Sequence, residues 1–130
     1  MAIYELSRYP KTLTLSGGDT VVVRPMTHAD APALLAFFRA IPEDERYFLK
    51  DDVASESTIQ AWADHLDYDR ALPLLAFDGD TVCADVLLIR HRSGARAHAA
   101  EIRLVVGEKY RSKGLGTALL REAAEVAWDA

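Results

Sequence analysis

The chain has 130 residues, half of them hydrophobic, which suits a single globular domain that buries roughly two-thirds of its unfolded surface. Its formal net charge of −5 argues against nucleic acid or an anionic membrane as the main partner. Its apolar runs fall far short of the ~20 residues of a membrane span, and no apolar signal segment opens the sequence. The single cysteine, Cys83, cannot form an internal disulfide, and we therefore expect a reducing cytoplasm.

Residues 13–24 predict a β-hairpin, because leucines alternate with threonines and the segment Ser-Gly-Gly-Asp supplies a turn. A helix follows, and Pro42 ends it. Either Thr27 or Asp30 could cap its first turn; Pro32 favours Asp30, because proline fits the first turn of a helix better than its interior. The residues expected to face the core at helical spacing are Leu34, Leu35, Phe38 and Ile41.

An acidic stretch at residues 43–52, with five acids against two bases, separates this helix from the next one. It is either a lip that attracts a cationic amine or simply a solvated loop. The second helix is predicted near Ser57, which forms a capping-box pattern with Gln60 three residues later. Its expected apolar face consists of Ile59, Trp62, Ala63 and Leu66.

Two further strands are predicted at residues 74–77 and 82–89, with the turn signal Asp-Gly-Asp between them. Asp85 stands inside the second strand, and we expect it to face solvent or to bond a neighbouring N–H group. The loop 91–98 contains two histidines, but no carboxylate or cysteine stands beside them at ligand spacing, so no metal site is expected there.

The most informative stretch is residues 101–128. It predicts a strand at 102–106, a turn with the sequence Arg-Ser-Lys-Gly-Leu-Gly, and a helix without proline. A glycine-rich turn at this place directs free backbone N–H groups and the positive end of the helix dipole toward one point. The two glycines permit close approach of the backbone, and the arginine and lysine add positive charge. The pattern predicts a phosphate or pyrophosphate site; the alternative is a tight turn that binds no ligand.

Two common phosphate-binding patterns do not fit this turn. A Walker loop needs Gly-Lys followed by Ser or Thr, whereas here Lys113 precedes Gly114. A dinucleotide fingerprint needs glycine or alanine at position 119, which is Leu119. What remains resembles the acyl-CoA pyrophosphate loop of the GNAT superfamily of N-acetyltransferases, in strand, loop and helix alike. The residues that carry the resemblance are Arg111, Ser112, Lys113, Gly114, Leu115 and Gly116, with Leu-Val-Val before them and Thr-Ala-Leu-Leu after them.

The resemblance covers roughly residues 20–130 and implies an α/β (α+β) fold, in which a mostly antiparallel mixed sheet carries helices on both faces. In the family, a further strand, a helix and a final pair of strands follow the helix that here ends near residue 130. We therefore expect residues 1–130 to form a single GNAT-like domain that is incomplete at its C-terminus. Its fourth strand would keep an unpaired edge, which we expect to dimerise, swap elements or aggregate.

The activity implied by the resemblance is acetyl-CoA-dependent transfer of an acetyl group to the primary amine of a small molecule or a protein. Acetyl-CoA is then the co-substrate, and no metal takes part. The alternative is a CoA-binding or interaction module without catalysis. The resemblance assigns the pantetheine arm to the backbone of Leu104, Val105 and Val106. It assigns the pyrophosphate to the backbone around Arg111, Ser112, Lys113, Gly114, Leu115, Gly116 and Thr117.

Acetyl transfer also needs a base, because an amine with a pKa of ~10.4 is only about 0.04% neutral at pH 7. Glu101 opens the fourth strand and resembles a glutamate that some family members use as this base, directly or through water. Arg103 shares its face of the strand and could pair with it, which would weaken Glu101 as a base. The alternative is that Glu101 is only a solvated charge at a strand end. In the family, a tyrosine beyond the equivalent of residue 130 often supplies the general acid.

Overall fold

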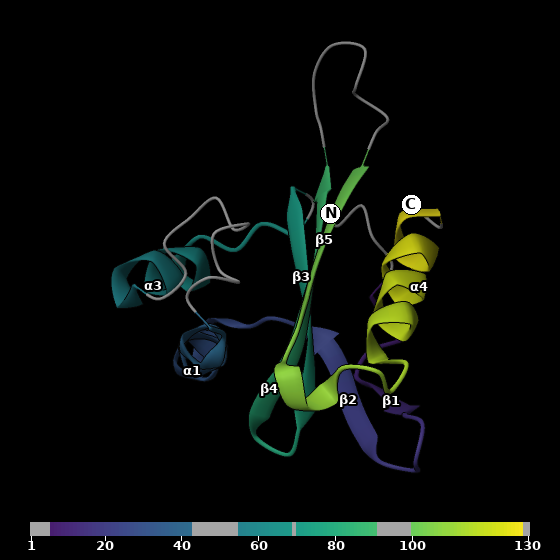
Figure 1. Cartoon of the computed structure of the whole chain (residues 1–130). Helices are drawn as coiled ribbons and strands as arrows, with labels where there is room; N and C mark the ends of the chain where they lie inside the picture. Colours follow the sequence, from purple (N-terminus) through teal and green to yellow (C-terminus); the bar gives the residue numbers. More distant parts are fainter. Residues whose placement is uncertain (1–5, 43–54, 69, 91–99, 129–130) are drawn as a thin grey trace.

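The computed structural model describes residues 6–42, 55–68, 70–90 and 100–128. They contain a five-stranded sheet in which every neighbouring pair is antiparallel and the strands lie side by side in chain order (Figure 1). The strands are β1 (Lys11–Thr14), β2 (Thr20–Pro25), β3 (Ala71–Asp78), β4 (Thr81–Arg90) and β5 (Ala100–Val106).

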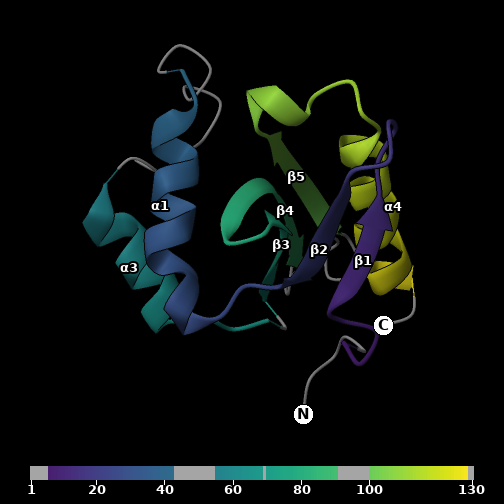
Figure 2. The same cartoon turned by 90° about the horizontal axis from the view of Figure 1, so that it is seen from below.

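Helices cover both faces of this sheet, as the predicted fold class requires. The helices α1 and α3 lie on one face and α4 lies on the other (Figures 1 and 2). Successive side chains of a strand point to opposite faces, so β3 and β4, which have apolar residues at nearly every position, can supply both cores. The helices are the 3₁₀ turn η1 (His28–Asp30), α1 (Ala31–Ala40), α3 (Glu56–Asp64), the 3₁₀ turn η3 (Glu108–Tyr110) and α4 (Leu115–Trp128).

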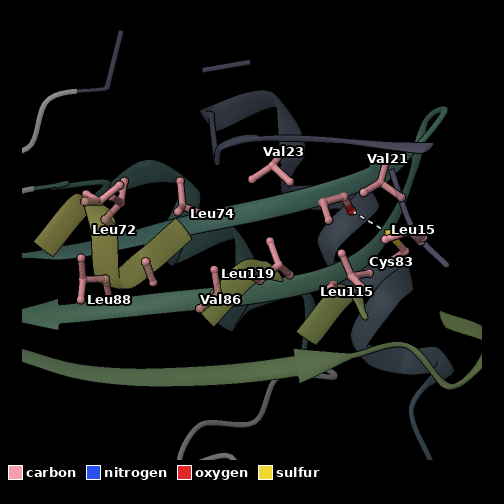
Figure 3. Close-up of a cluster of buried hydrophobic side chains, with 14 residues drawn as sticks. Leu15, Val21, Val23, Leu72, Leu74, Cys83, Val86, Leu88, Leu115 and Leu119 are labelled. Atoms are coloured by element: carbon pink, nitrogen blue, oxygen red, sulfur yellow. Dashed lines mark hydrogen bonds between the residues drawn. The ribbon is translucent and has the colours of Figure 1, made fainter. Parts of the chain in front are cut away.

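The larger core lies between α4 and the sheet (Figure 3). Leu115 and Leu119 of α4 are completely buried in one cluster with Leu74 and Val86 of the central strands. Each fully buried leucine contributes roughly 1.5–3 kcal/mol relative to an exposed one, so this face holds the first turns of α4 firmly on the sheet. The core on the other face contains Met26, Leu34, Phe37, Phe38, Ile41, Ile59, Ala63, Leu75, Phe77 and Val82.

The sequence placed these elements correctly but set some of their ends wrongly. The predicted hairpin at 13–24 is confirmed, and so are both helices with their apolar faces, except that Leu66 packs against the core from beyond the end of α3 at Asp64. Strand β3 begins at Ala71 rather than at residue 74, because its pairing with β4 continues past the point where β2 ends. The predicted capping box at Ser57 is wrong. Helix α3 is N-capped by Ser55, and the amide of Gln60 bonds Asp64 at 2.9 Å.

Two segments singled out in the sequence, the acidic stretch 43–52 and the basic loop 91–98, lie outside the described residues. Within the part of the chain that the structure describes, no helix combines the length and apolar character needed to cross a membrane.

The start of α1 is held by a partly buried ion pair, in which the Asp30 carboxylate is buried and the Arg24 side chain is about one-third exposed. The Arg24 guanidinium at the end of β2 donates to both carboxylate oxygens of Asp30, at 2.7 and 2.9 Å, and stacks 4.2 Å from the ring centroid of Phe77. The same carboxylate accepts the Thr27 N–H, so Thr27 caps η1 and Asp30 precedes α1. Burial alone would raise the pKa of Asp30, but the hydrogen bonds from Arg24 and Thr27 hold it below its ordinary value.

Replacing Arg24 by methionine should destabilise the protein by about 3 kcal/mol, because it strands a buried carboxylate without its partner. Urea unfolding at pH 7 measures this loss. The control is Arg8→Gln at the longer ion pair with Glu125, 3.8 Å, whose carboxylate is about half exposed, and it should cost less than about 1 kcal/mol. Equal stability of the Arg24 variant and wild type would show that this pair does not hold α1.

Candidate functional site

The connection from β5 to α4 is tied to the β3–β4 hairpin. The Gly107 N–H donates to the Cys83 carbonyl of β4 at 2.8 Å, which continues the β4–β5 ladder by one residue. The Tyr110 hydroxyl of η3 donates to the Asp78 carboxylate at the end of β3, also at 2.8 Å. These contacts fix where the chain leaves the sheet and therefore where α4 begins.

The first turn of α4 presents its free N–H groups at the surface, next to the exposed Gly114. Gly114 has a φ of +85°, and its carbonyl accepts the N–H of Ala118 at 3.0 Å, so it stands at the N-cap position. The N–H groups of residues 115–117 have no partner within the helix. A Cβ built on Gly114 would have only the Ser16 hydroxyl near it, at 3.8 Å, which leaves room for a ligand. Ser112, with a φ of +64°, completes the turn.

The tip of the β1–β2 hairpin supports this loop from outside. The Ser16 N–H donates to the Lys113 carbonyl at 3.0 Å, and the Lys113 ammonium lies 3.6 Å from the Asp19 carboxylate. Arg111 donates from Nε to the Val106 carbonyl at 3.2 Å. Both basic side chains of the predicted loop therefore contact the protein itself, while the helix N–H groups stay available for an anion.

Gly116 has a packing role that the sequence did not predict. A Cβ at this position would come within 3.3 Å of Leu104 and 3.6 Å of Val106, so a larger residue would have to push these β5 side chains aside. The side chain of Leu115 is completely buried, and that of Thr117 is exposed. Through this packing, the start of α4 lies beside the end of β5.

Only alternate residues of β5 direct their backbone groups toward its outer edge. The Gly107 N–H donates to the Cys83 carbonyl, so these two residues form a hydrogen-bonded pair. Hydrogen-bonded pairs alternate along an antiparallel ladder, so Val105 and Arg103, two and four residues back, also direct their backbone groups toward β4. Val105 belongs to that inward set, whereas Leu104 and Val106 direct their N–H groups outward. Within the described residues, β5 pairs with β4 alone.

Glu101 and Arg103 meet on the α1 face of β5, as their spacing predicted. The Arg103 Nε lies 2.5 Å from the Glu101 Oε2, and both side chains are about one-third exposed. The carboxylate that the sequence offered as a base is therefore held by a guanidinium at the surface.

Asp85 contradicts its prediction, because it neither faces solvent nor bonds a neighbouring N–H. Only 8% of the residue is exposed, and among the described residues its Oδ1 has no hydrogen-bond partner. Burial raises the pKa of its carboxyl to about 7. The signal was present in the sequence as an acid at the centre of the apolar strand Val-Cys-Ala-Asp-Val-Leu-Leu-Ile.

Two other chemistries find no support in the described residues. No group of three or more His, Cys, Asp or Glu side chains in the described ranges could hold a metal ion. Cys83 is a buried free thiol that bonds the Ala76 carbonyl at 3.3 Å, and burial raises its pKa to about 11 (Figure 3). A thiol so rarely ionised is a packing residue.

Comparisons with known proteins agree with this geometry. The GNAT domain of S. lividans PAT has a TM-score of 0.81 and 26% identity, over 95% of this chain and 74% of that one. A GCN5-related N-acetyltransferase from Kribbella flavida has a TM-score of 0.66 and 27% identity, over 83% and 65%. Mycobacterium smegmatis RimJ, solved in complex with CoA-disulfide, shares the fold at 19% identity, with a TM-score of 0.61, over 92% and 63%. The chain thus spans less than two-thirds of the last two structures.

No curated protein is a significant match to the sequence. The family model described as the acetyltransferase (GNAT) family, however, matches residues 34–130, well over half of the chain. The match contains the β5–α4 loop, and the solved relatives share the sheet that presents it. The chain therefore belongs to the GNAT family of acetyltransferases.

Proposed function

We propose that this protein is an acetyl-CoA-dependent N-acetyltransferase that acts on a primary amine. The observation that carries the proposal is the N-terminus of α4 at the exposed Gly114, beside the edge of β5 that no described strand pairs with. A helix N-terminus suits a diphosphate, and the adjacent strand edge suits an amide-bearing arm that pairs with it as an additional strand would. Family membership supports acetyl transfer as the reaction.

The residues present fit CoA in two places. The N–H groups around Gly114, Leu115, Gly116 and Thr117 would hold the pyrophosphate, with the turn at Arg111, Ser112 and Lys113 around it. The outward backbone groups of β5 would hold the pantetheine arm, and by the alternation above this role falls to Leu104 and Val106 rather than to Val105.

Acetyl-CoA supplies the acetyl group: a bond forms between the amine nitrogen and the acetyl carbon, and the C–S bond of the thioester breaks. The ammonium loses two protons in all, and CoA leaves as the thiol with one of them. The protein must take the other proton and must polarise the carbonyl, for which outward N–H groups of β5 are suited. Glu101 is the carboxylate that the family resemblance offers for this base, and its charge at the end of β5 would also attract an ammonium group. No metal takes part in this proposal.

Replacing Gly114 by valine should weaken CoA binding at least about 100-fold, because the side chain would fill the space over the free N–H groups and φ would move away from +85°. Titration calorimetry with CoA measures the affinity. Arg111→Ala should cost no more than about fivefold, since that side chain is exposed.

The matched control is Gly79→Val, which places the same side chain at a positive φ of +62° in the β3–β4 turn, with open space around it. It tests backbone strain without obstructing the loop. Equal affinity of the Gly114 variant and wild type would reject the pyrophosphate site.

Glu101→Gln separates the two roles of this carboxylate. Removing its charge should raise KM for the amine several-fold, because an opposite charge near the entrance is lost. A further fall of about 10²–10⁴ in kcat would identify Glu101 as the base itself. Steady-state release of CoA thiol at several amine concentrations gives both constants, and an unchanged kcat and KM would leave Glu101 outside the site.

The second candidate function is a CoA-binding or interaction module without catalysis, which is favoured by the pairing of β5 with β4 alone among the described strands. The enzyme releases free thiol from acetyl-CoA when amines are added, whereas the module binds CoA and releases none.

An open strand edge also favours self-association. We expect multi-angle light scattering of the 130-residue chain to show a homodimer or larger species, and a monodisperse monomer would contradict this expectation.

We further propose a reducing compartment, the cytoplasm, on the ground of the single buried cysteine. The acceptor is a small-molecule or protein amine, and the negative net charge supports a cationic acceptor over nucleic acid or an anionic membrane.

A further inference from the structure

Asp85 is an anomaly among the buried acids of the described chain. Three acidic residues are more than nine-tenths buried there, and two of them have firm partners: Asp30 bonds Arg24, and Glu122 bonds Lys11 and Tyr9. In contrast, the Oδ1 of Asp85 has no hydrogen-bond partner in the described structure. Burying a carboxylate without a partner is costly, and buried unsatisfied groups of this kind call for a specific explanation.

The register places Asp85 directly beside the segment of β5 that would bind the pantetheine arm. Arg24, Leu75, Asp85 and Val105 are cross-strand partners in one row on the α1 face of the sheet. Val105 lies between the two outward-directed residues of β5, so Asp85 is one strand, about 4.8 Å, inward from that edge.

Glu101 is less well placed for the same task. It lies four residues from Val105 along β5, which is roughly 13 Å at ~3.3 Å per residue, and Arg103 already holds it. Asp85, unlike Glu101, lies in the row of Val105 itself, and within the described structure it has no cationic partner.

We propose that Asp85 is the residue that takes the proton from the acceptor amine, while Glu101 attracts that amine to the end of β5. This assignment rests on the proposed function. In the step, the ammonium R–NH₃⁺ gives one proton to the Asp85 carboxylate, so that neutral R–NH₂ and neutral Asp85–COOH result. The proton then passes to solvent, and the carboxylate is restored.

The surroundings of Asp85 suit this role. On its own face, the charged groups from neighbouring strands are Arg24, Glu101 and Arg103, which are already engaged in ion pairs. The charged residue of α1, Arg39, is exposed, and Asp64 of α3 bonds Gln60 and His28. Burial therefore dominates the environment of Asp85 and brings its pKa to about 7, the range in which a base is most effective at neutral pH.

Asp85→Asn tests the assignment with methylamine as the probe, since it is the smallest primary amine with a carbon substituent. In wild type, kcat/KM for methylamine-dependent thiol release should rise with pH through an ionisation near 7. The variant should lose about 10²–10⁴-fold of that rate and the ionisation with it, and should bind CoA as wild type does. The control Glu122→Gln, a buried acid on the other face of the sheet, should retain the ionisation near 7.

A rate in Asp85→Asn within about threefold of wild type, at unchanged CoA affinity, would overturn the assignment. If wild type binds CoA but releases no thiol with any amine, the proposed function fails instead. In that case, a measurement that needs no catalytic turnover tests the ionisation of Asp85.

Carbon-13 NMR of the aspartate carboxyls, with the Asp85 signal identified by its absence in Asp85→Asn, provides that readout. The signal should titrate near pH 7 and should shift when methylammonium is added to the CoA complex. A signal that titrates near 4, or that ignores methylammonium, would overturn the assignment.

Urea unfolding shows that the Asp85→Asn variant is folded. Its pH dependence shows whether ionisation of Asp85 lowers or raises the stability of the protein. Wild type should lose stability as pH rises from about 4 to about 7, because the unfolded chain ionises Asp85 before the folded chain does. The unfolding midpoint of Asp85→Asn relative to wild type should therefore increase between pH 5 and pH 8. A constant difference across that range would show that Asp85 is not the group that ionises near 7.

Discussion

The close packing of the first turn of α4 on β5 is the constraint on which the candidate site depends. Gly116 has no side chain where a Cβ would stand 3.3 Å from Leu104, and Leu115 is completely buried beside it. The helix axis is thereby fixed against the sheet, and its unpaired N–H groups are held beside the end of β5. A looser helix would carry the same dipole but would not aim it at the place where the strand edge ends.

The two faces of the sheet carry different groups of residues, because successive side chains of each strand point to opposite faces. On the α4 face, apolar residues of all strands form the larger core, which holds the anion-binding turn in place. On the α1 face, the row that contains Asp85 and the row that contains Glu101 interrupt an otherwise apolar surface with acids. The larger core lies on one face of the sheet, and the acids suited to proton transfer stand on the other.

Much of the site was predictable because it is local in sequence. The strand, the glycine turn and the helix start follow one another within 28 residues, and each has its own pattern. The Glu101–Arg103 contact was predictable for the same reason, since residues two apart share a face of a strand. The support of Lys113 by Ser16 was not predictable, because nearly one hundred residues separate these positions and only the sheet brings them together.

Asp85 shows the limit of reading a strand by itself. An acid within an apolar run can face water or a core, and its own neighbours in sequence do not decide which; the helix laid over that face does.

By itself, the amino-acid sequence determined the family, the order of the elements, the glycine turn and the two apolar faces, because each depends on residues within a few positions of one another. Only the tertiary structure decided which backbone groups of β5 face outward, which basic side chains are already engaged, and which carboxylate is buried without a partner. These are properties of contacts between strands and helices distant in the chain, so they exist only once the chain has folded.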